Sequence, residues 1–466
     1  MMISGEILAR LKAAVGPNGF SEEPHEIAPH LVEWRSKYRG STPLLLKPRS
    51  TEEVSSILKI CHETATPIVP QGGNTGLVGG QIPLNGEILL SLARLDRIRR
   101  IDPADMSVIA EAGVILAKLQ EATAAADCFF PLSLAAEGSC TIGGNLSTNA
   151  GGVNVLRYGS ARALAIGIEV VLADGRVLDM LRTLRKDNTG YDLKQLFIGA
   201  EGTLGVVTAA ALRLFPRPRM RQTAWLAVDD PRAALEVLHR LEAATGQLVS
   251  AFELIDRQGL EFVLAHIPNA KEPLRAPASW YVLTEIAGHA ALKDIVEAAI
   301  ATALDDGLVS DAVIATSEAQ RASLWHLRES VSEAQKYEGA SIKHDIAVPV
   351  ALVPDFIEQG ISAVRARIPG VRPVTFGHMG DGNIHFNFSV PKGGDDAAFL
   401  SSWNEISRVV HDIVHRFAGS ISAEHGVGVM KREEILRYKS GTEMDLMRAL
   451  KRTFDPKNIL NPGKVI

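Results

Sequence analysis

The stretch Pro70-Gln71-Gly72-Gly73-Asn74-Thr75-Gly76-Leu77-Val78-Gly79-Gly80 follows a short apolar run, Ile68-Val69, that predicts a β-strand. Glycine lets a ligand approach the backbone closely, and successive N–H groups in such a loop can cradle a phosphate. The stretch lacks both the Gly-Lys-Ser/Thr ending of a Walker loop and the GxGxxG spacing of a Rossmann dinucleotide site. It therefore predicts an anion-binding loop of another kind.

Two more glycine-rich stretches follow, at residues 137–152 and 199–207. The first reads EGSCTIGGNLSTNAGG and the second GAEGTLGVV. Any one of the three taken alone is more often a tight turn than a binding loop. Three of them within one domain indicate a large anionic ligand that lies across several loops.

The surrounding chain alternates short strand-like runs with helical ones from residue 43 to 220. Residues 51–64 predict a helix with Thr51 as its N-cap. Pro216-Arg217-Pro218 ends this region, and we place a domain boundary near Arg217. Beyond it, the pattern predicts an α+β domain with helices on one face of an antiparallel sheet, including one helix over residues 318–337.

Two histidines flank a predicted hairpin in Gly377-His378-Met379-Gly380-Asp381-Gly382-Asn383-Ile384-His385. Asp381-Gly382 is a favoured two-residue turn, and with this turn His378 faces His385 across the strand pair. Opposite residues have Cβ atoms roughly 4.5–5.5 Å apart. Two imidazoles so placed can bind one cation, although they could simply form hydrogen bonds within a loop.

A catalytic metal needs a third protein ligand and an open position. The best candidate is Glu424, which precedes His425 in Ser422-Ala423-Glu424-His425-Gly426. Imidazole and carboxylate ligands suit zinc, manganese, iron or cobalt. We expect one divalent ion, with zinc as the working assignment.

Composition limits the partners. The 466 residues carry 49 Lys+Arg against 54 Asp+Glu, so the net charge is −5, which argues against nucleic acid as a partner. Three cysteines without metal-ligand spacing are typical of reduced thiols. Residues 1–16 predict an amphipathic helix without a signal-peptide core, and no apolar run reaches 18 residues, so we expect a cytoplasmic protein without a transmembrane segment.

Together, the glycine-rich stretches resemble the FAD-binding domain of flavoproteins of the vanillyl-alcohol oxidase (PCMH) type, over about residues 40–466. The entry segment 42–54 and the ending FDPKNILNPGK at 454–464 are also similar to that family. The resemblance implies an α+β fold with a two-part FAD-binding domain at 1–218 (from about 40), a substrate or cap domain at 219–420 and a C-terminal segment at 421–466 that returns to the flavin. The FAD-contacting residues it implies are Pro70, Gly72, Gly73, Asn74, Thr75, Gly76, Leu77, Gly138, Thr141, Gly143, Gly144, Asn145, Thr148, Asn149, Gly151, Gly152, Glu201, Gly202, Gly205, Val206 and Asn461.

Within that group, the chain looks most like the D-2-hydroxyglutarate and D-lactate dehydrogenase branch. The resemblance implies that His378, His385 and Glu424 bind the metal and that His425 is the general base. It also implies a carboxylate site made of Arg328, Ser332, Lys343 and Asn387, with Arg328 and Ser332 on one face of the 318–337 helix. Members acting on D-2-hydroxyglutarate often have Thr where this chain has Ser332, which puts the substrate choice in question.

The expected reaction is oxidation of a D-2-hydroxy acid to the 2-oxo acid, with D-2-hydroxyglutarate first and D-lactate, D-malate or glycolate as alternatives. FAD is expected to bind non-covalently, because the first loop carries no histidine that could attach it. An external acceptor, an electron-transferring flavoprotein or the quinone pool, must reoxidise it. A homodimer is one option for the oligomeric state. Rival classes are a metal-dependent hydrolase, a flavin transferase of the ether-lipid synthase kind and a non-catalytic flavin subunit.

Overall fold

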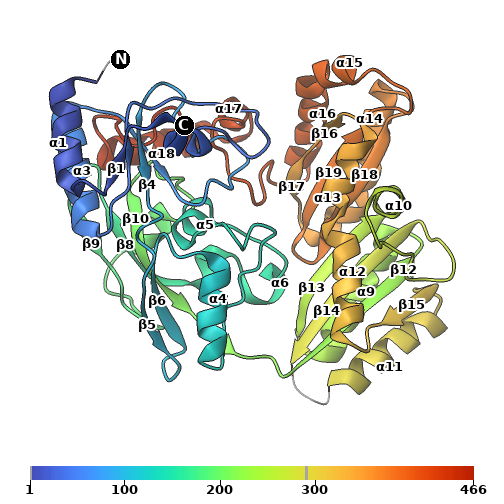
Figure 1. Ribbon diagram of the computed structural model, residues 1–466. Coiled ribbons are helices and arrows are strands. Elements are labelled where there is room, and N and C mark those ends of the chain that lie inside the picture. Colours follow the sequence, from blue (N-terminus) through green and yellow to red (C-terminus); the bar gives the residue numbers. More distant parts are fainter. Residues whose placement is uncertain (1–2, 289–291) are drawn as a thin grey trace. The chain divides into compact units, whose positions relative to one another are not determined.

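The computed structural model describes residues 3–288 and 292–466, which form two compact units (Figure 1). Unit 1 comprises 3–151, Gly159–Arg217 and Glu424–Ile466, and unit 2 comprises Gly152–Tyr158 and Pro218–Ala423. The expected N-terminal helix is α1 (Gly5–Val15), and Met1 and Met2 lie outside the described residues. Among the described residues, no helix combines the length and apolar character needed to cross a bilayer.

The first sheet of unit 1 has the strand order β1 (Phe20–Ser21), β2 (Leu45–Leu46), β4 (Ile88–Ser91) and β3 (Ile68–Gln71). Strand β4 runs parallel to both β2 and β3. Helices α1 and α3 (Thr51–Thr64) contribute to its apolar core. The C-terminal segment joins this sheet, because Ile68 N donates to Ile459 O and Asn461 N donates to Ile68 O, each at 2.9 Å. The chain end is thereby fixed beside the strand that enters the first glycine-rich loop.

The second sheet of unit 1 is antiparallel, in the order β5 (Ile98–Asp102), β6 (Ser107–Glu111), β10 (Val206–Arg213), β8 (Ala165–Val171) and β9 (Val177–Asp179). A two-stranded ribbon pairs β7 (Cys128–Phe129) with β11 (Phe215–Pro216). The remaining α-helices of unit 1 are α2 (Pro24–Ile27), α4 (Leu116–Ala125), α5 (Ile142–Thr148), α7 (Ala161–Leu164), α8 (Lys194–Phe197), α17 (Arg432–Tyr438) and α18 (Gly441–Phe454).

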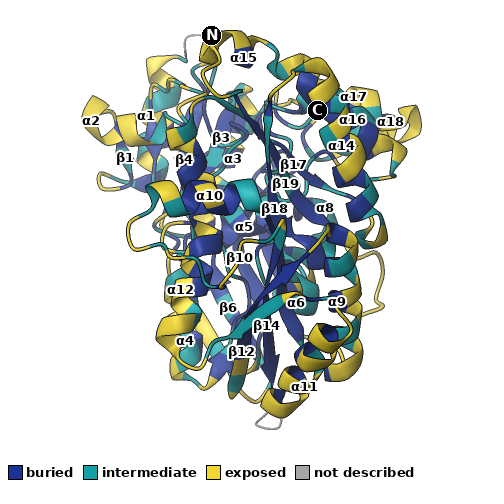
Figure 2. Ribbon diagram, turned by 90° about the vertical axis from the view of Figure 1, so that its right-hand side faces the viewer, coloured by how far each residue is buried: buried dark blue, intermediate teal, exposed yellow. Residues whose placement is uncertain are grey.

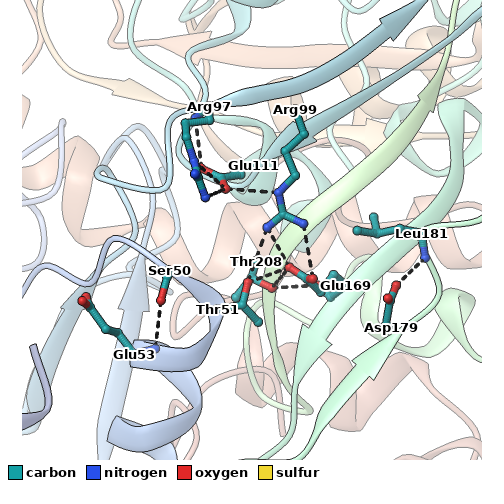
Figure 3. Close-up of polar contacts among 10 residues, drawn as sticks. All are labelled: Ser50, Thr51, Glu53, Arg97, Arg99, Glu111, Glu169, Asp179, Leu181 and Thr208. Carbon is teal, nitrogen blue, oxygen red and sulfur yellow. Dashed lines mark hydrogen bonds and ion pairs between the residues drawn. The ribbon is translucent and has the colours of Figure 1, made fainter.

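A polar network fastens the start of α3 to the second sheet (Figure 3). Arg99 donates to Glu111 at 3.1 Å and to Glu169 at 3.0 Å, and Glu169 also accepts from Thr51 at 2.7 Å. The prediction of Thr51 as N-cap is therefore wrong. Ser50 caps the helix by accepting from Glu53 N, which leaves the Thr51 hydroxyl to bind Glu169.

Unit 2 is built on an antiparallel sheet in the order β15 (Asp311–Ile314), β12 (Met220–Val228), β14 (Trp280–Gly288), β13 (Val249–Asp256), β18 (Arg372–His378), β19 (Asn383–Ser389) and β16 (Ser341–Ile342), and β17 (Asp345–Ala347) also pairs with β19. Its α-helices are α6 (Val155–Tyr158), α9 (Pro231–Thr245), α10 (Arg257–His266), α11 (Leu292–Asp305), α12 (Glu318–Glu329), α13 (Val331–Ala334), α14 (Val353–Arg367), α15 (Asp396–Ser401) and α16 (Trp403–Arg416).

Helices cover both faces of this sheet rather than the single face predicted. Trp225 and Ala227 share one core with α10, α12 and α13. Helices α9 and α11 contact β12 but add no residue to that core, so they pack on the opposite face, because alternate strand residues point to opposite sides. The strands are buried along most of their length, and the outer surface of α11 is exposed (Figure 2).

Two local predictions in unit 2 are wrong. The hairpin turn is not two residues long, because a 3-10 turn, Met379–Asp381, precedes Gly382 and moves the register. His385 is paired with Phe376, and His378 is paired with Glu253 on the neighbouring strand. The predicted 318–337 helix is interrupted between α12 and α13, so that Arg328 is buried and Ser332 is exposed.

Candidate functional site

The three glycine-rich stretches line one cavity in unit 1, of about 260 Å³. The predicted cofactor residues that line it are Pro70, Gly72, Gly73, Asn74, Thr75, Gly76, Leu77, Thr141, Gly143, Gly144, Asn145, Thr148, Gly151, Glu201 and Gly202. Glu424 and His425 line it too. Gly138, Asn149, Gly205, Val206 and Asn461 belong to unit 1 but are not among the lining residues, and Gly152 belongs to unit 2.

The first two loops pack so closely that only glycine fits between them. A Cβ on Gly73 would lie 2.0 Å from Ser139 O, and a Cβ on Gly72 would lie 2.4 Å from Thr141 Oγ1. The Asn74 side chain turns away to hold the loop, donating to Pro29 O at 3.0 Å and Val32 O at 3.1 Å. At residues 72–74, an occupant of the cavity would therefore meet the backbone rather than side chains.

The cavity's chemistry fits a phosphate-containing ligand held by neutral donors. None of the described residues that line it is Lys or Arg, so backbone N–H groups must balance an anion there. The Thr141 hydroxyl is buried and has no hydrogen-bond partner among the described residues. Buried polar atoms nearly always form a hydrogen bond, so this hydroxyl is a candidate to bind a ligand in the cavity.

Glu201 holds the segment that carries Glu424 and His425. Its carboxylate accepts from Val427 N at 2.7 Å and from Gly428 N at 2.9 Å. Burial raises the pKa of this carboxyl, partly offset by these two amides. Glu201 was predicted to contact the cofactor, but its oxygens are engaged by the 424–428 backbone, so its observed contribution is to fix that segment at the rim of the cavity.

The C-terminal segment supports the same rim. The Asn461 side chain donates to Gly80 O at 2.9 Å and to Glu201 O at 2.8 Å, which joins the first and third loops. Asn461 was predicted to contact the cofactor directly. It is not among the residues that line the cavity, and its side chain ties the loops together.

His378, the last residue of β18, and His385 in the neighbouring strand β19 lie close together in unit 2. Their ring centroids are 5.7 Å apart and the rings are roughly perpendicular. A buried carboxylate adjoins each ring: Glu253 lies 2.6 Å from His378 Nδ1, and Asp345 lies 4.0 Å from His385 Nδ1. The two rings thus lie close together although the strand register differs from the predicted one.

The predicted carboxylate-binding residues are distributed differently within unit 2. Arg328 is buried, and its guanidinium binds Glu253 through Nε at 2.7 Å and Nη2 at 2.6 Å. Lys343 donates to the Ser332 carbonyl at 3.4 Å, so these two are neighbours. Asn387 is buried, and its amide joins His344 N and the Gln335 side chain, each at 3.1 Å.

Glu253 is the functional candidate that the sequence did not reveal. Burial alone would raise the pKa of its carboxyl, but the nearby His378 and Arg328 outweigh burial and lower that pKa to about 2. An acidic residue in an otherwise apolar strand, Ala251-Phe252-Glu253-Leu254-Ile255, was the available signal. Full burial of an ionised group requires a specific partner, and here it has two.

Comparison with known proteins places this geometry in context. Residues 42–181 match the model described as "FAD binding domain", and residues 217–465 match "FAD linked oxidases, C-terminal domain". A mitochondrial D-2-hydroxyglutarate dehydrogenase of Bos taurus is 40% identical, with 100% of this chain and 84% of that protein covered. A D-2-hydroxyglutarate dehydrogenase of Xanthomonas citri pv. viticola is 36% identical, with 98% and 96% covered.

Solved structures show the same fold at much lower identity. p-Cresol methylhydroxylase is similar with a TM-score of 0.77 and 17% identity, covering 99% of this chain and 96% of that one. Alkyldihydroxyacetonephosphate synthase has a TM-score of 0.73 and 16% identity, with 99% and 85% covered.

Proposed function

The chain belongs to the family of FAD-linked oxidases, and from that membership we propose that it oxidises D-2-hydroxyglutarate to 2-oxoglutarate. Relatives about 40% identical over nearly the whole chain carry that activity in their names. The observation within the molecule that supports it most is the cavity of unit 1, where three glycine-rich loops meet Glu424 and His425. It brings a glycine-rich anion site together with a carboxylate and an imidazole.

We propose that the loops of unit 1 hold FAD without a covalent bond. The first loop offers backbone N–H groups for the pyrophosphate, and the Thr141 hydroxyl offers a further contact. Cys140 also lines the cavity, but burial raises the pKa of its thiol to about 11, which leaves a poor nucleophile. When bound, FAD supplies the two-electron acceptor that the protein itself lacks.

We propose that His378, His385 and Glu424 bind one divalent metal, with zinc as the first candidate. Two imidazoles and a carboxylate form a catalytic rather than a closed structural ligand set. The adjacent His378 and His385 rings support the first two ligands, and Glu424 rests on its motif beside His425. Such an ion, when bound, lowers the pKa of a hydroxyl it contacts.

The proposed role of His425 is to accept the proton of the substrate's 2-hydroxyl on its imidazole. Removing that proton makes loss of the α-hydrogen as a hydride favourable, and general bases contribute on the order of 10²–10⁴ in rate. Glu201 serves this step indirectly, because it fixes the backbone two residues further along. A base held in place needs no reorganisation when the substrate arrives.

Arg328 and Lys343 are proposed to bind the substrate's carboxylates. A diacid suits two cations better than lactate does, since each cation can serve one carboxylate. Ser332 is also proposed to bind the substrate, since the Lys343 ammonium donates a hydrogen bond to the Ser332 carbonyl and the two residues are therefore neighbours. Asn387 retains a proposed contact role, although its amide is already engaged by Gln335 and His344.

An acceptor-dependent dye assay tests the proposed function. We expect the purified protein to reduce dye with D-2-hydroxyglutarate, to be inactive with the L-isomer and to lose most activity after chelation, while its FAD content stays constant. D-lactate is the second candidate, because a putative D-lactate dehydrogenase of Schizosaccharomyces pombe is 38% identical. Faster turnover with D-lactate would reassign the substrate, and no turnover with any 2-hydroxy acid would contradict the proposal.

The acceptor, assembly and location are also proposals. We propose an electron-transferring flavoprotein or the quinone pool as the acceptor, since the sequence carries no second redox motif. A homodimer and a cytoplasmic location are our working assignments, although eukaryotic relatives are named mitochondrial. Light scattering and cell fractionation test these two assignments.

A further inference from the structure

Three charged or titratable side chains form a buried cluster in unit 2: Glu253, Arg328 and His378. Glu253 is fully buried, Arg328 is 7% exposed and His378 is 8% exposed. One Glu253 oxygen accepts a hydrogen bond from Arg328 Nε at 2.7 Å and forms an ion pair with Arg328 Nη2 at 2.6 Å. The other lies 2.6 Å from His378 Nδ1. The Glu253 carboxylate therefore contacts both His378, which is proposed to bind the metal, and Arg328, which is proposed to bind the substrate.

The fold presents these three groups to one another from separate elements. Glu253 in β13 is paired with His378 in β18, so the two side chains lie on the same face of the sheet. Arg328 comes from the last turn of α12, and its guanidinium also stacks over the Phe376 ring at 4.9 Å. The arrangement fixes the plane of the guanidinium from two sides.

The chemistry of this cluster determines which histidine nitrogen carries the proton. A carboxylate bound to a guanidinium is ionised, so it can only accept hydrogen bonds. His378 Nδ1 must then donate to it, and in the neutral ring the lone pair falls on Nε2. Metal-bound histidines typically use such a carboxylate on the second ring nitrogen to fix tautomer and orientation.

We infer that Glu253 is a positioning residue that holds His378 in the Nδ1–H tautomer for the metal and at the same time orients the Arg328 guanidinium for the substrate's carboxylate. The inference rests on the proposed function for the identity of the two ligands. Arg328 donates a hydrogen bond from Nε and pairs Nη2 with Glu253, whereas Nη1 makes no hydrogen bond or ion pair with a described residue. Nη1 is therefore the edge from which Arg328 would donate to a carboxylate.

The alternative is a buried ion pair that only stabilises the sheet. Glu285 in β14 provides a matched control, because it is also buried and accepts from Arg321 Nε at 2.6 Å and Trp325 Nε1 at 3.1 Å. Glu285 contacts none of the proposed site residues. Any loss shared by Glu253→Gln and Glu285→Gln reports general damage to unit 2, and any excess in Glu253→Gln reports positioning.

Glutamine is the informative substitution because its amide has only one acceptor oxygen. If that oxygen stays on Arg328, the amide NH₂ faces His378 Nδ1 and can bind it only when the proton has moved to Nε2. If the amide flips, the NH₂ group faces Arg328, which is itself a donor. Glu253→Gln therefore cannot preserve both contacts, although it changes neither size nor shape.

The experiment measures Zn²⁺ affinity by titration of metal-stripped, FAD-loaded protein and the His378 tautomer by ¹⁵N NMR, with His378→Asn for assignment. We expect wild type to show the proton on Nδ1, and Glu253→Gln to bind Zn²⁺ about 10- to 100-fold more weakly and to raise the KM for D-2-hydroxyglutarate. FAD content and melting temperature should match those of Glu285→Gln.

A proton on Nε2 in the wild-type protein would overturn the inference even if Glu253→Gln failed to fold. So would a Zn²⁺ affinity of Glu253→Gln equal to that of wild type or of Glu285→Gln. Neither result depends on turnover, so failure of the proposed substrate would leave this test decisive.

Discussion

His425 is the side chain on which the proposed oxidation depends. It lines the unit 1 cavity, and the backbone just after it is held by Glu201. We expect His425→Ala to lower kcat on the order of 10²- to 10⁴-fold, because the hydroxyl proton loses its acceptor. Dye-coupled kinetics measure the loss, and the flavin absorbance should be unchanged. Normal turnover in this variant would assign the base elsewhere.

The reactivity of the three cysteines tests how closely the protein packs around them. Burial raises the pKa of Cys61 to about 12 and that of Cys140 to about 11, and it also raises the pKa of Cys128. Thiols do not react until they ionise, so we expect no labelling by a disulfide reagent at pH 8 in the folded protein. Complete labelling should follow denaturation. Rapid labelling of Cys140 in the native protein would contradict the closed packing of the second loop.

Among single residues, the glycines of the cavity loops were the easiest to predict. Gly72 and Gly73 line the cavity, and the sequence indicated this because a run of glycines allows a ligand to approach the backbone closely. The roles of Glu201 and Glu253 were not predictable, because a carboxylate's partner is chosen by tertiary packing. Glu201 reaches a segment 226 residues away and Glu253 one that is 125 residues away.

Among the secondary-structure elements, the register of the hairpin strands was predicted wrongly. The Asp381-Gly382 signal is real, since Gly382 has a φ of 84°, but a 3-10 turn placed before it moved His385 opposite Phe376. The helix signal after residue 318 was also real, yet the helix is interrupted at Ser330, so Val331 packs into the core and Ser332 faces outward. Local propensity predicted both elements and could not fix their register.

The contact between the first two glycine-rich loops gives a prediction at this scale. A Cβ at position 73 would lie 2.0 Å from Ser139 O, which is backbone and cannot swing aside. We expect Gly73→Ala to separate the loops and to yield protein with much less bound FAD. Gly441→Ala is the control, because a Cβ there meets nothing within 4 Å and Gly441 is not among the residues that line the cavity. Equal FAD content in both variants would show that loop contact does not shape the cavity.

At the scale of the molecule, acid sensitivity follows from the network that joins α3 to the second sheet (Figure 3). Burial would raise the pKa of Glu111 and Glu169, but hydrogen bonds led by Arg97 and Arg99 outweigh it and lower both. Carboxyls with lowered pKa stabilise the fold above their unfolded pKa, and that stability is lost as pH falls through the folded value. The free energy of unfolding should therefore decline below about pH 4.5.

Arg99→Ala tests that network directly. It leaves Glu169 without its cation, and we expect it to lower the free energy of unfolding by roughly 1–3 kcal/mol at pH 7. The loss should shrink toward pH 3, because protonated carboxyls no longer need the arginine. Urea titrations at both pH values measure this, and a pH-independent loss would contradict the electrostatic explanation.

The division of the chain into two units could be predicted from the sequence only in part. Each unit has its own core, and the antiparallel sheet of unit 2 was predicted from its strand pattern, whereas the kinds of sheet in unit 1 were not. Residues 152–158 fall in unit 2, although Gly152 is the last residue of the second glycine-rich stretch and the others follow it directly. Nothing in their composition marks that change, because membership of a unit depends on contacts made far along the chain.

The most direct measurement is a visible absorption spectrum of the purified protein before and after anaerobic addition of D-2-hydroxyglutarate. We expect an oxidised-flavin spectrum that bleaches with the D-isomer and not with the L-isomer. A flavin spectrum that bleaches with neither isomer would contradict the substrate assignment, and a colourless protein that does not bind added FAD would contradict the account as a whole.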